Sequence, residues 1–177
     1  MSLAADIYKY KKYTSEHLNK MKEYYEKLSS INKVIYNAST GKNDSSKMDP
    51  HQWRVGKENG INGYNELIKK KSNIENAQSF EDVFEITESV REEIYGLGDL
   101  WSYDTALRIG FYLRKYPKDV YIQRGVITGV IKLFGNNPRE RKIQKFLFPQ
   151  ELQELESYEI ENFLCIWGKN ENKKNIC

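Results

Sequence analysis

The first 36 residues carry a regular pattern of apolar and polar positions. Spacings of three and four residues separate the apolar positions, as in the a/d seam of an amphipathic helix. The seam consists of Ile7, Tyr10, Thr14, His17, Met21, Tyr24, Leu28, Ile31 and Ile35. No Gly or Pro interrupts residues 4–36, which predicts one helix about 48 Å long at about 1.5 Å per residue. We expect this helix to pack along the body of the protein; pairing with a second copy, giving a homodimer, is the alternative.

The pattern then changes to a polar segment. Residues 37–50 contain a Gly and almost no apolar side chain, which predicts a linker. Asp49 and Pro50 at its end are typical of a helix N-cap and first turn. We therefore expect a helical domain over residues 51–168, followed by a frayed Lys- and Asn-rich tail over 169–177.

The middle of the chain has the strongest local signals. Ser79 and Asp82 form a capping box of the Asp type, and apolar residues at helical spacing follow as far as Tyr95. The turn Gly96-Leu97-Gly98 comes next. A second amphipathic segment extends from residue 99 to residue 113 and ends before a proline. The pattern predicts two helices joined by a tight turn, over about residues 80–114.

The remaining segments predict short helices. Strand alternation is nowhere sustained, and the apolar patch at residues 120–122 is too brief to support a sheet. The predicted fold class is therefore all-α.

Composition restricts the class of protein. Hydrophobic residues make up 39% of the 177 residues, which is enough for a packed core. No apolar run is long enough to span a membrane, and the first residues do not resemble a signal peptide. Cys165 and Cys177 are the only cysteines, so neither a disulfide framework nor an iron–sulfur cluster is expected. The sequence predicts a cytoplasmic protein without a metal site or a cofactor.

Charge is uneven along the chain although the net charge is only +3. Residues 79–110 contain two basic and eight acidic residues, whereas residues 111–150 contain nine basic and two acidic residues. Residues 151–162 are acidic again. Neutralisation between acidic and basic helices inside the protein is the favoured interpretation. A basic patch that binds a polyanion is the alternative.

The turn between the two middle helices resembles the helix-hairpin-helix motif of DNA-repair and DNA-binding proteins. In that motif, two glycines around an apolar residue expose backbone amides that bind a phosphate at the start of the next helix. Gly96, Leu97 and Gly98 match this arrangement. The resemblance implies non-specific binding of a nucleic-acid backbone, with DNA as the expected partner. The cations that would neutralise its phosphates are Arg114, Lys115, Lys118 and Arg124.

In helix-hairpin-helix DNA glycosylases, the catalytic aspartate follows the hairpin by about twenty residues. Asp119 follows Gly98 by 21 residues. The resemblance implies that its carboxylate would stabilise positive charge on the sugar as the glycosidic bond breaks. Asp99 and Leu100 stand where lyase-type members have a lysine, which is a departure from the family pattern.

Residues 96–110 are also similar to a block in small uncharacterised bacterial proteins. Those proteins contain elements like His51-Gln52-Trp53-Arg54 and like residues 161–166. The resemblance implies that polar residues of these blocks meet in one site, namely His51, Arg54, Tyr103, Asp104 and Arg108. Asp104 and Arg108 are spaced i,i+4, which most often gives a structural salt bridge. The alternative is an acid–base constellation that includes His51.

Three functions follow from these patterns. The first is binding of a nucleic-acid backbone through the hairpin. The second is a non-catalytic protein-interaction or assembly domain, in which the hairpin only joins two core helices. The third is a DNA N-glycosylase-like activity based on Asp119. Of these, a non-enzymatic function is favoured.

Overall fold

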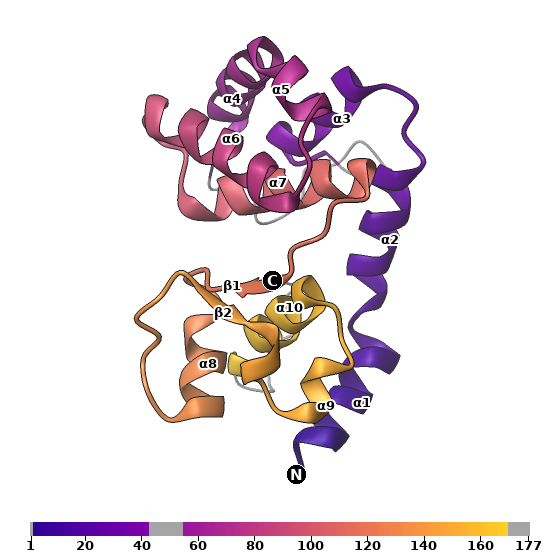
Figure 1. Cartoon of the computed structure of the whole chain (residues 1–177), viewed down its shortest axis with the longest axis vertical. Coiled ribbons are helices and arrows are strands. Elements are labelled where there is room, and N and C mark those ends of the chain that lie inside the picture. The colour runs from indigo at the N-terminus through magenta and orange to yellow at the C-terminus, as the bar shows by residue number, and fades with distance from the viewer. Residues whose placement is uncertain (1, 43–54, 170–177) are drawn as a thin grey trace. The chain divides into compact units, whose positions relative to one another are not determined.

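The computed structural model describes residues 2–42 and 55–169, and most of them are helical (Figure 1). The all-α fold class is confirmed. The helices are α1 (Leu3–Tyr13), α2 (Glu16–Glu26), α3 (Ile31–Thr40), α4 (Lys57–Lys69), α5 (Lys71–Glu75), α6 (Phe80–Glu93), α7 (Asp99–Leu113), α8 (Ile127–Phe134), α9 (Gln150–Gln153) and α10 (Ser157–Gly168). A short 3-10 turn, η2 (Lys145–Leu147), and the strands β1 (Asp119–Tyr121) and β2 (Lys142–Gln144) complete the described elements.

The chain forms two compact units. Unit 1 contains residues 1–19 and 117–177, and unit 2 contains residues 20–116. One boundary lies inside α2 and the other lies between Tyr116 and Pro117. The expected helical domain over 51–168 is therefore divided, because residues 117–168 belong to the same unit as the start of the chain.

The prediction of one long N-terminal helix is wrong, because residues 4–36 form α1, α2 and the start of α3. At the first break, the Ser15 hydroxyl donates to the Lys11 carbonyl (2.9 Å), and the Ser15 amide bonds to Tyr10 O instead of Lys11 O. A serine side chain that binds a helix carbonyl competes with the backbone ladder. At the second break, Ser30 is extended, with φ −138° and ψ 124°.

The break after Tyr13 also shifts the apolar seam by one position. Ile7 and Tyr10 are buried as predicted, but the next buried positions are Ser15, Leu18 and Tyr25. His17, which the pattern placed in the seam, is exposed.

The predicted linker over 37–50 begins too early. Residues 37–40 are the last four residues of α3 and are buried. The helix ends at Gly41, whose φ of 66° is left-handed. Residues 43–50 lie outside the described part of the chain.

Unit 2 is built around the pair α6 and α7. The predicted bounds of the second helix, residues 99–113, match α7. The predicted capping box at the start of α6 is also confirmed. The Asp82 amide donates to the Ser79 hydroxyl, and the Asp82 carboxylate accepts from the Ser79 amide (3.0 Å). Hydrogen bonds from the backbone amides of Gln78 (2.7 Å) and Ser79 to the Asp82 carboxylate hold its pKa below the ordinary value. Trp101 anchors α7 to α3, since its indole N–H donates to Ser39 O (2.9 Å).

Replacement of Ser79 by Ala is expected to lower the unfolding free energy by about 1 kcal/mol, because the cap of α6 loses its acceptor. Denaturant titration followed by circular dichroism measures the change. Ser89→Ala is the matched control, since that hydroxyl donates inside the same helix, to Ile86 O, and caps no amide. Equal effects of the two substitutions would contradict the capping role.

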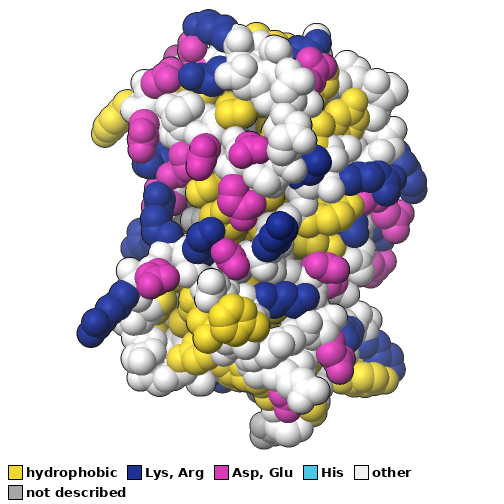
Figure 2. Space-filling model, in the orientation of Figure 1, with side chains coloured by type: hydrophobic (Ala, Val, Ile, Leu, Met, Phe, Trp, Pro, Cys, Tyr) yellow, Lys and Arg dark blue, Asp and Glu magenta, His cyan; other side chains and the backbone are white. Residues whose placement is uncertain are grey.

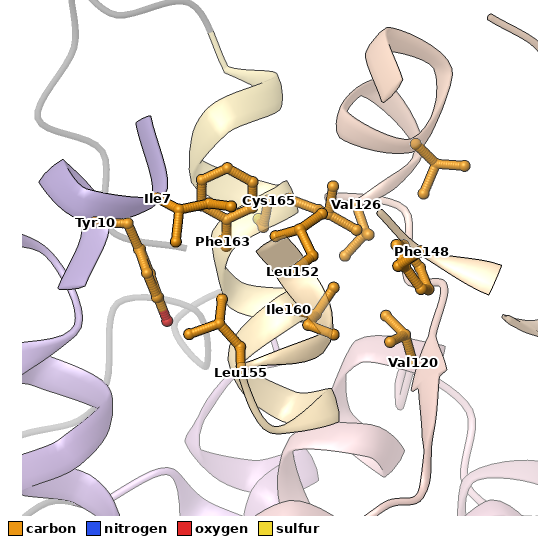
Figure 3. Packing of buried hydrophobic residues seen from close by; sticks show 12 residues of the cluster. Ile7, Tyr10, Val120, Val126, Phe148, Leu152, Leu155, Ile160, Phe163 and Cys165 are labelled. Atoms are coloured by element: carbon orange, nitrogen blue, oxygen red, sulfur yellow. The ribbon is translucent and has the colours of Figure 1, made fainter. Parts of the chain in front are cut away.

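The core of unit 1 brings together residues from both of its chain segments. Figure 3 shows Ile7 and Tyr10 of α1 beside Phe163 of α10. The Tyr10 hydroxyl donates to Asn162 Oδ1 (3.1 Å), and the Trp167 indole donates to Asp6 Oδ2 (3.0 Å). The buried cluster is Ile7, Tyr10, Val120, Val126, Val130, Phe148, Leu152, Leu155, Ile160, Phe163, Leu164 and Cys165.

The expectation that residues 120–122 support no sheet is wrong for this unit. Val120 pairs with Ile143 in an antiparallel ribbon formed by β1 and β2. Each strand has only three residues, too few for alternation to stand out in the sequence. In the described parts of the chain, no helix has the length and apolarity that a membrane span requires.

Candidate functional site

The turn between α6 and α7 is a tight connection set by its glycines. Gly96 has φ of 97°, a left-handed conformation that favours glycine, and an added Cβ would come within 3.2 Å of Asn59 Cγ. Leu97 is buried, whereas Gly98 is exposed and occupies the N-cap position of α7. The two predicted helices and the tight turn between them are therefore present, and the turn residue Leu97 is buried.

The side chains around this turn are mainly acidic. Arg91 lies 3.1 Å from Glu88, 3.4 Å from Glu92 and 3.4 Å from Asp99. Burial lowers the pKa of Arg91, but the hydrogen bond and charge of Glu88 together with the charges of Asp99 and Glu92 outweigh burial, and the pKa rises. The Ser102 hydroxyl also donates to Glu88. A phosphate at the Gly98 amide would meet Asp99 in the first turn of the same helix, which opposes anion binding electrostatically.

The four predicted phosphate-neutralising cations are divided between the two units. Arg114 caps the far end of α7, about 24 Å from Gly98 along the helix axis. Lys115 follows it in unit 2, whereas Lys118 and Arg124 belong to unit 1.

Asp119 is the first residue of β1, where its Cα pairs with that of Gln144. It therefore lies in a strand and not in one of the short helices predicted for this part of the chain. Its carboxylate lies 3.0 Å from Lys142 Nζ on the neighbouring strand, in a cross-strand ion pair. Asp119 belongs to unit 1, whereas Gly96 and Gly98 belong to unit 2. Neither unit by itself therefore contains both the predicted catalytic aspartate and the predicted phosphate-binding turn.

The predicted polar cluster is only partly assembled. Arg108 is buried, donates to Ala38 O (3.3 Å) and lies 3.9 Å from the Asp104 carboxylate. Its positive charge thus lies at the C-terminal end of α3, where the helix dipole favours a cation. Tyr103 is instead in ring contact with Phe80 and Phe84 of α6. His51 and Arg54 lie outside the described residues.

No group of three or more potential metal ligands occurs among residues 2–42 and 55–169. Unit 2 has a surface hollow of about 410 Å³ beside the turn. It is lined by Asn59, Asn62, Asn65, Glu66, Glu93, Ile94 and Tyr95.

A surface in unit 1 that the sequence patterns did not predict has an unusual composition. Phe146 and Leu147 in η2 are 67% and 55% exposed, and Ile131 and Phe134 on the neighbouring α8 are also exposed. Figure 2 shows apolar side chains with Lys or Arg side chains beside them in the region of α8 and β2. We call this set the basic apolar surface: Ile131, Phe134, Phe146, Leu147, Lys132, Lys142 and Lys145. The run Lys145-Phe146-Leu147-Phe148-Pro149 was the signal in the sequence that could have indicated it.

The basic apolar surface is held by specific contacts. The Phe134 ring packs against the buried Phe148 ring at a centroid distance of 5.4 Å. The Gln153 side-chain amide donates to the carbonyls of Phe146 (3.2 Å) and Phe148 (2.6 Å), which fixes the η2 turn. Lys132 Nζ lies 3.8 Å from the centroid of the Trp167 ring. The exposed apolar side chains are therefore presented on a structured support.

Comparison of the chain with protein-family models, with curated proteins and with solved structures finds no match. The candidate function therefore depends on the residues and contacts described above.

Proposed function

We propose that this chain is a non-catalytic protein-interaction domain whose basic apolar surface binds an acidic, partly apolar segment of a partner. The exposure of Phe146 and Leu147 is the observation that carries the proposal. Contiguous apolar side chains rimmed by charges are typical of protein-binding surfaces. Covering them removes apolar area from water, which contributes about 25 cal/mol per Å² before the costs of association.

Charge selects the partner. Residues 118–145 contain seven basic and two acidic residues. Lys132 follows Ile131 in the chain, and Lys142 and Lys145 come shortly before Phe146 and Leu147. A symmetric contact of this surface with itself would bring like charges together, which is unfavourable. An acidic partner segment instead gains electrostatic attraction at the rim and apolar burial at the centre.

Binding of a nucleic-acid backbone is the second candidate, and the helix-hairpin-helix resemblance supports it. The tight turn with its exposed Gly98 favours it, whereas the carboxylates of Glu88 and Asp99 around the turn oppose it. The glycosylase-like activity has less support, because Lys142 already pairs with the Asp119 carboxylate.

The proposal is tested with a fluorescent helical peptide of about 18 residues that carries Leu at a and d positions and Glu elsewhere. We expect fluorescence anisotropy to detect binding to the full chain. The double substitution Phe146→Ser and Leu147→Ser should weaken binding about tenfold or more, because it removes the apolar centre of the surface.

The matched control changes two other exposed aromatic residues of unit 1. Tyr8→Ser with Tyr13→Ser should leave the affinity unchanged, since these side chains are 62% and 68% exposed on α1. Equal loss in both double variants, or no binding of the peptide to the unaltered chain, would overturn the proposal. Salt-dependent binding of duplex DNA that Phe146→Ser with Leu147→Ser leaves intact would favour the hairpin function instead.

A further inference from the structure

The hairpin tip of unit 2 has the composition that the proposed partner segment requires. We define the tip as Glu92, Glu93, Tyr95, Asp99 and Leu100, around the turn between α6 and α7. Tyr95 is fully exposed and Leu100 is exposed as well, so the tip presents apolar side chains to solvent. The three other members are acidic, which makes the tip opposite in charge to the basic apolar surface.

The surface hollow beside the turn adds to this match. Glu66 and Glu93 both line it, together with the side chains of Asn59, Asn62 and Asn65. Lys69 lies 2.6 Å from Glu66, and Lys70 lies 3.4 Å from Glu93. The tip, the hollow and the ion pairs around them together carry a net charge of −2. This count sets Lys69, Lys70 and Arg91 against five carboxylates, those of Glu66, Glu88, Glu92, Glu93 and Asp99. Amide and carboxylate oxygens around a hollow suit the ammonium group of an incoming lysine.

The tip and the basic apolar surface therefore complement each other in two ways. Tyr95 and Leu100 of the tip are exposed and apolar, as are Phe146 and Leu147 of the basic apolar surface. The carboxylates of the tip are opposite in charge to Lys132, Lys142 and Lys145. A contact between two different surfaces of identical chains is head-to-tail, and the resulting pair still has one tip and one basic apolar surface uncovered. Such association proceeds beyond a dimer unless the geometry closes a ring.

We propose that the chain assembles head-to-tail, with the hairpin tip of one copy bound to the basic apolar surface of the next. This inference rests on the proposed function and names its partner as a second copy of the same chain. Because the attraction at the rim lies between exposed charges, added salt screens it. The assembly is therefore expected to weaken between about 0.05 and 0.5 M salt.

Sedimentation velocity of the full chain over a range of concentrations tests the assembly. We expect the mean sedimentation coefficient to rise with concentration at low salt. Tyr95→Ser with Glu93→Lys inactivates the tip, and Phe146→Ser with Leu147→Ser inactivates the basic apolar surface. Each double variant alone should remain monomeric, and circular dichroism should show that each is folded, because the changed side chains are exposed.

A mixture of the two variants provides the decisive measurement. The tip variant keeps its basic apolar surface and the surface variant keeps its tip, so the mixture should form a 1:1 complex that grows no further. Tyr8→Ser with Tyr13→Ser should assemble like the unaltered chain.

Monomers at all concentrations, or a dimer that persists in both variants, would overturn head-to-tail assembly. If the acidic peptide still binds in that case, the interaction function stands and only the choice of partner fails. If the peptide does not bind either, both proposals fail.

Discussion

Replacement of Gly129 by Ala is expected to lower the unfolding free energy of unit 1 by about 3 kcal/mol. Gly129 lies in α8 against the backbone of α10, and an added Cβ would come within 2.8 Å of the Leu164 carbonyl carbon and 3.0 Å of its Cα. These neighbours are backbone atoms, so the two helices must separate before the methyl group fits. The separation would loosen a core that contains Leu164 and Val130.

Denaturant titration gives the loss, and hydrogen exchange measured on peptides from each unit shows where it occurs. We expect faster exchange in α8 and α10 and little change in α6 and α7. Thr128→Ala is the matched control, because that neighbouring side chain is exposed. A stability of Gly129→Ala within about 0.5 kcal/mol of the unaltered chain would contradict the close approach of α8 and α10.

The second large effect is expected for Arg108→Ala, with a loss of about 3 kcal/mol from the stability of unit 2. The substitution removes a buried cation that donates to Ala38 O and lies beside Asp104. The partly buried carboxylate of Asp104 then loses a nearby opposite charge, and the end of α3 loses a donor.

Two further variants separate this role from a general effect of charge. Arg114→Ala removes an exposed cation from the end of the same helix, α7, and should change the stability far less. Asp104→Asn combined with Arg108→Met should recover part of the loss, because the carboxylate charge is removed together with the guanidinium. A stability of Arg108→Ala close to that of Arg114→Ala would show that the buried pair contributes little.

The two proposals explain the uneven charge along the chain by contacts between molecules. The sequence patterns instead favoured neutralisation between acidic and basic helices of one molecule. Acidic residues around the α6–α7 turn and basic residues around η2 lie on different units. We propose that they meet between copies of the chain. The mixing experiment distinguishes this arrangement from a surface that binds only other acidic proteins.

The sequence alone determined the elements whose signals are local. The capping box at Ser79 and the positive φ of Gly96 depend on a few neighbouring residues, so α6, the turn and α7 were predictable. Asp104 and Arg108 were predictable neighbours for the same reason, since i,i+4 residues share a helix face.

Patterns that extend over many residues were less informative. The apolar seam passes through Thr14 without interruption, yet the hydrogen bond from the Ser15 hydroxyl and the packing of Leu18 break the helix and shift the register. The charge count over residues 111–150 combined Arg114 and Lys115 with Lys118, although the boundary between the units lies between them. The position of that boundary does not depend on local spacing.

Only the tertiary structure decided which apolar residues reach the surface. Phe146, Leu147 and Phe148 are adjacent in the sequence and nearly equal in hydrophobicity, so no periodicity separates them. The η2 turn buries Phe148 against Phe134 and leaves the other two exposed. The choice depends on side chains from α8 and on Gln153 of α9, which contact this turn only once the chain has folded.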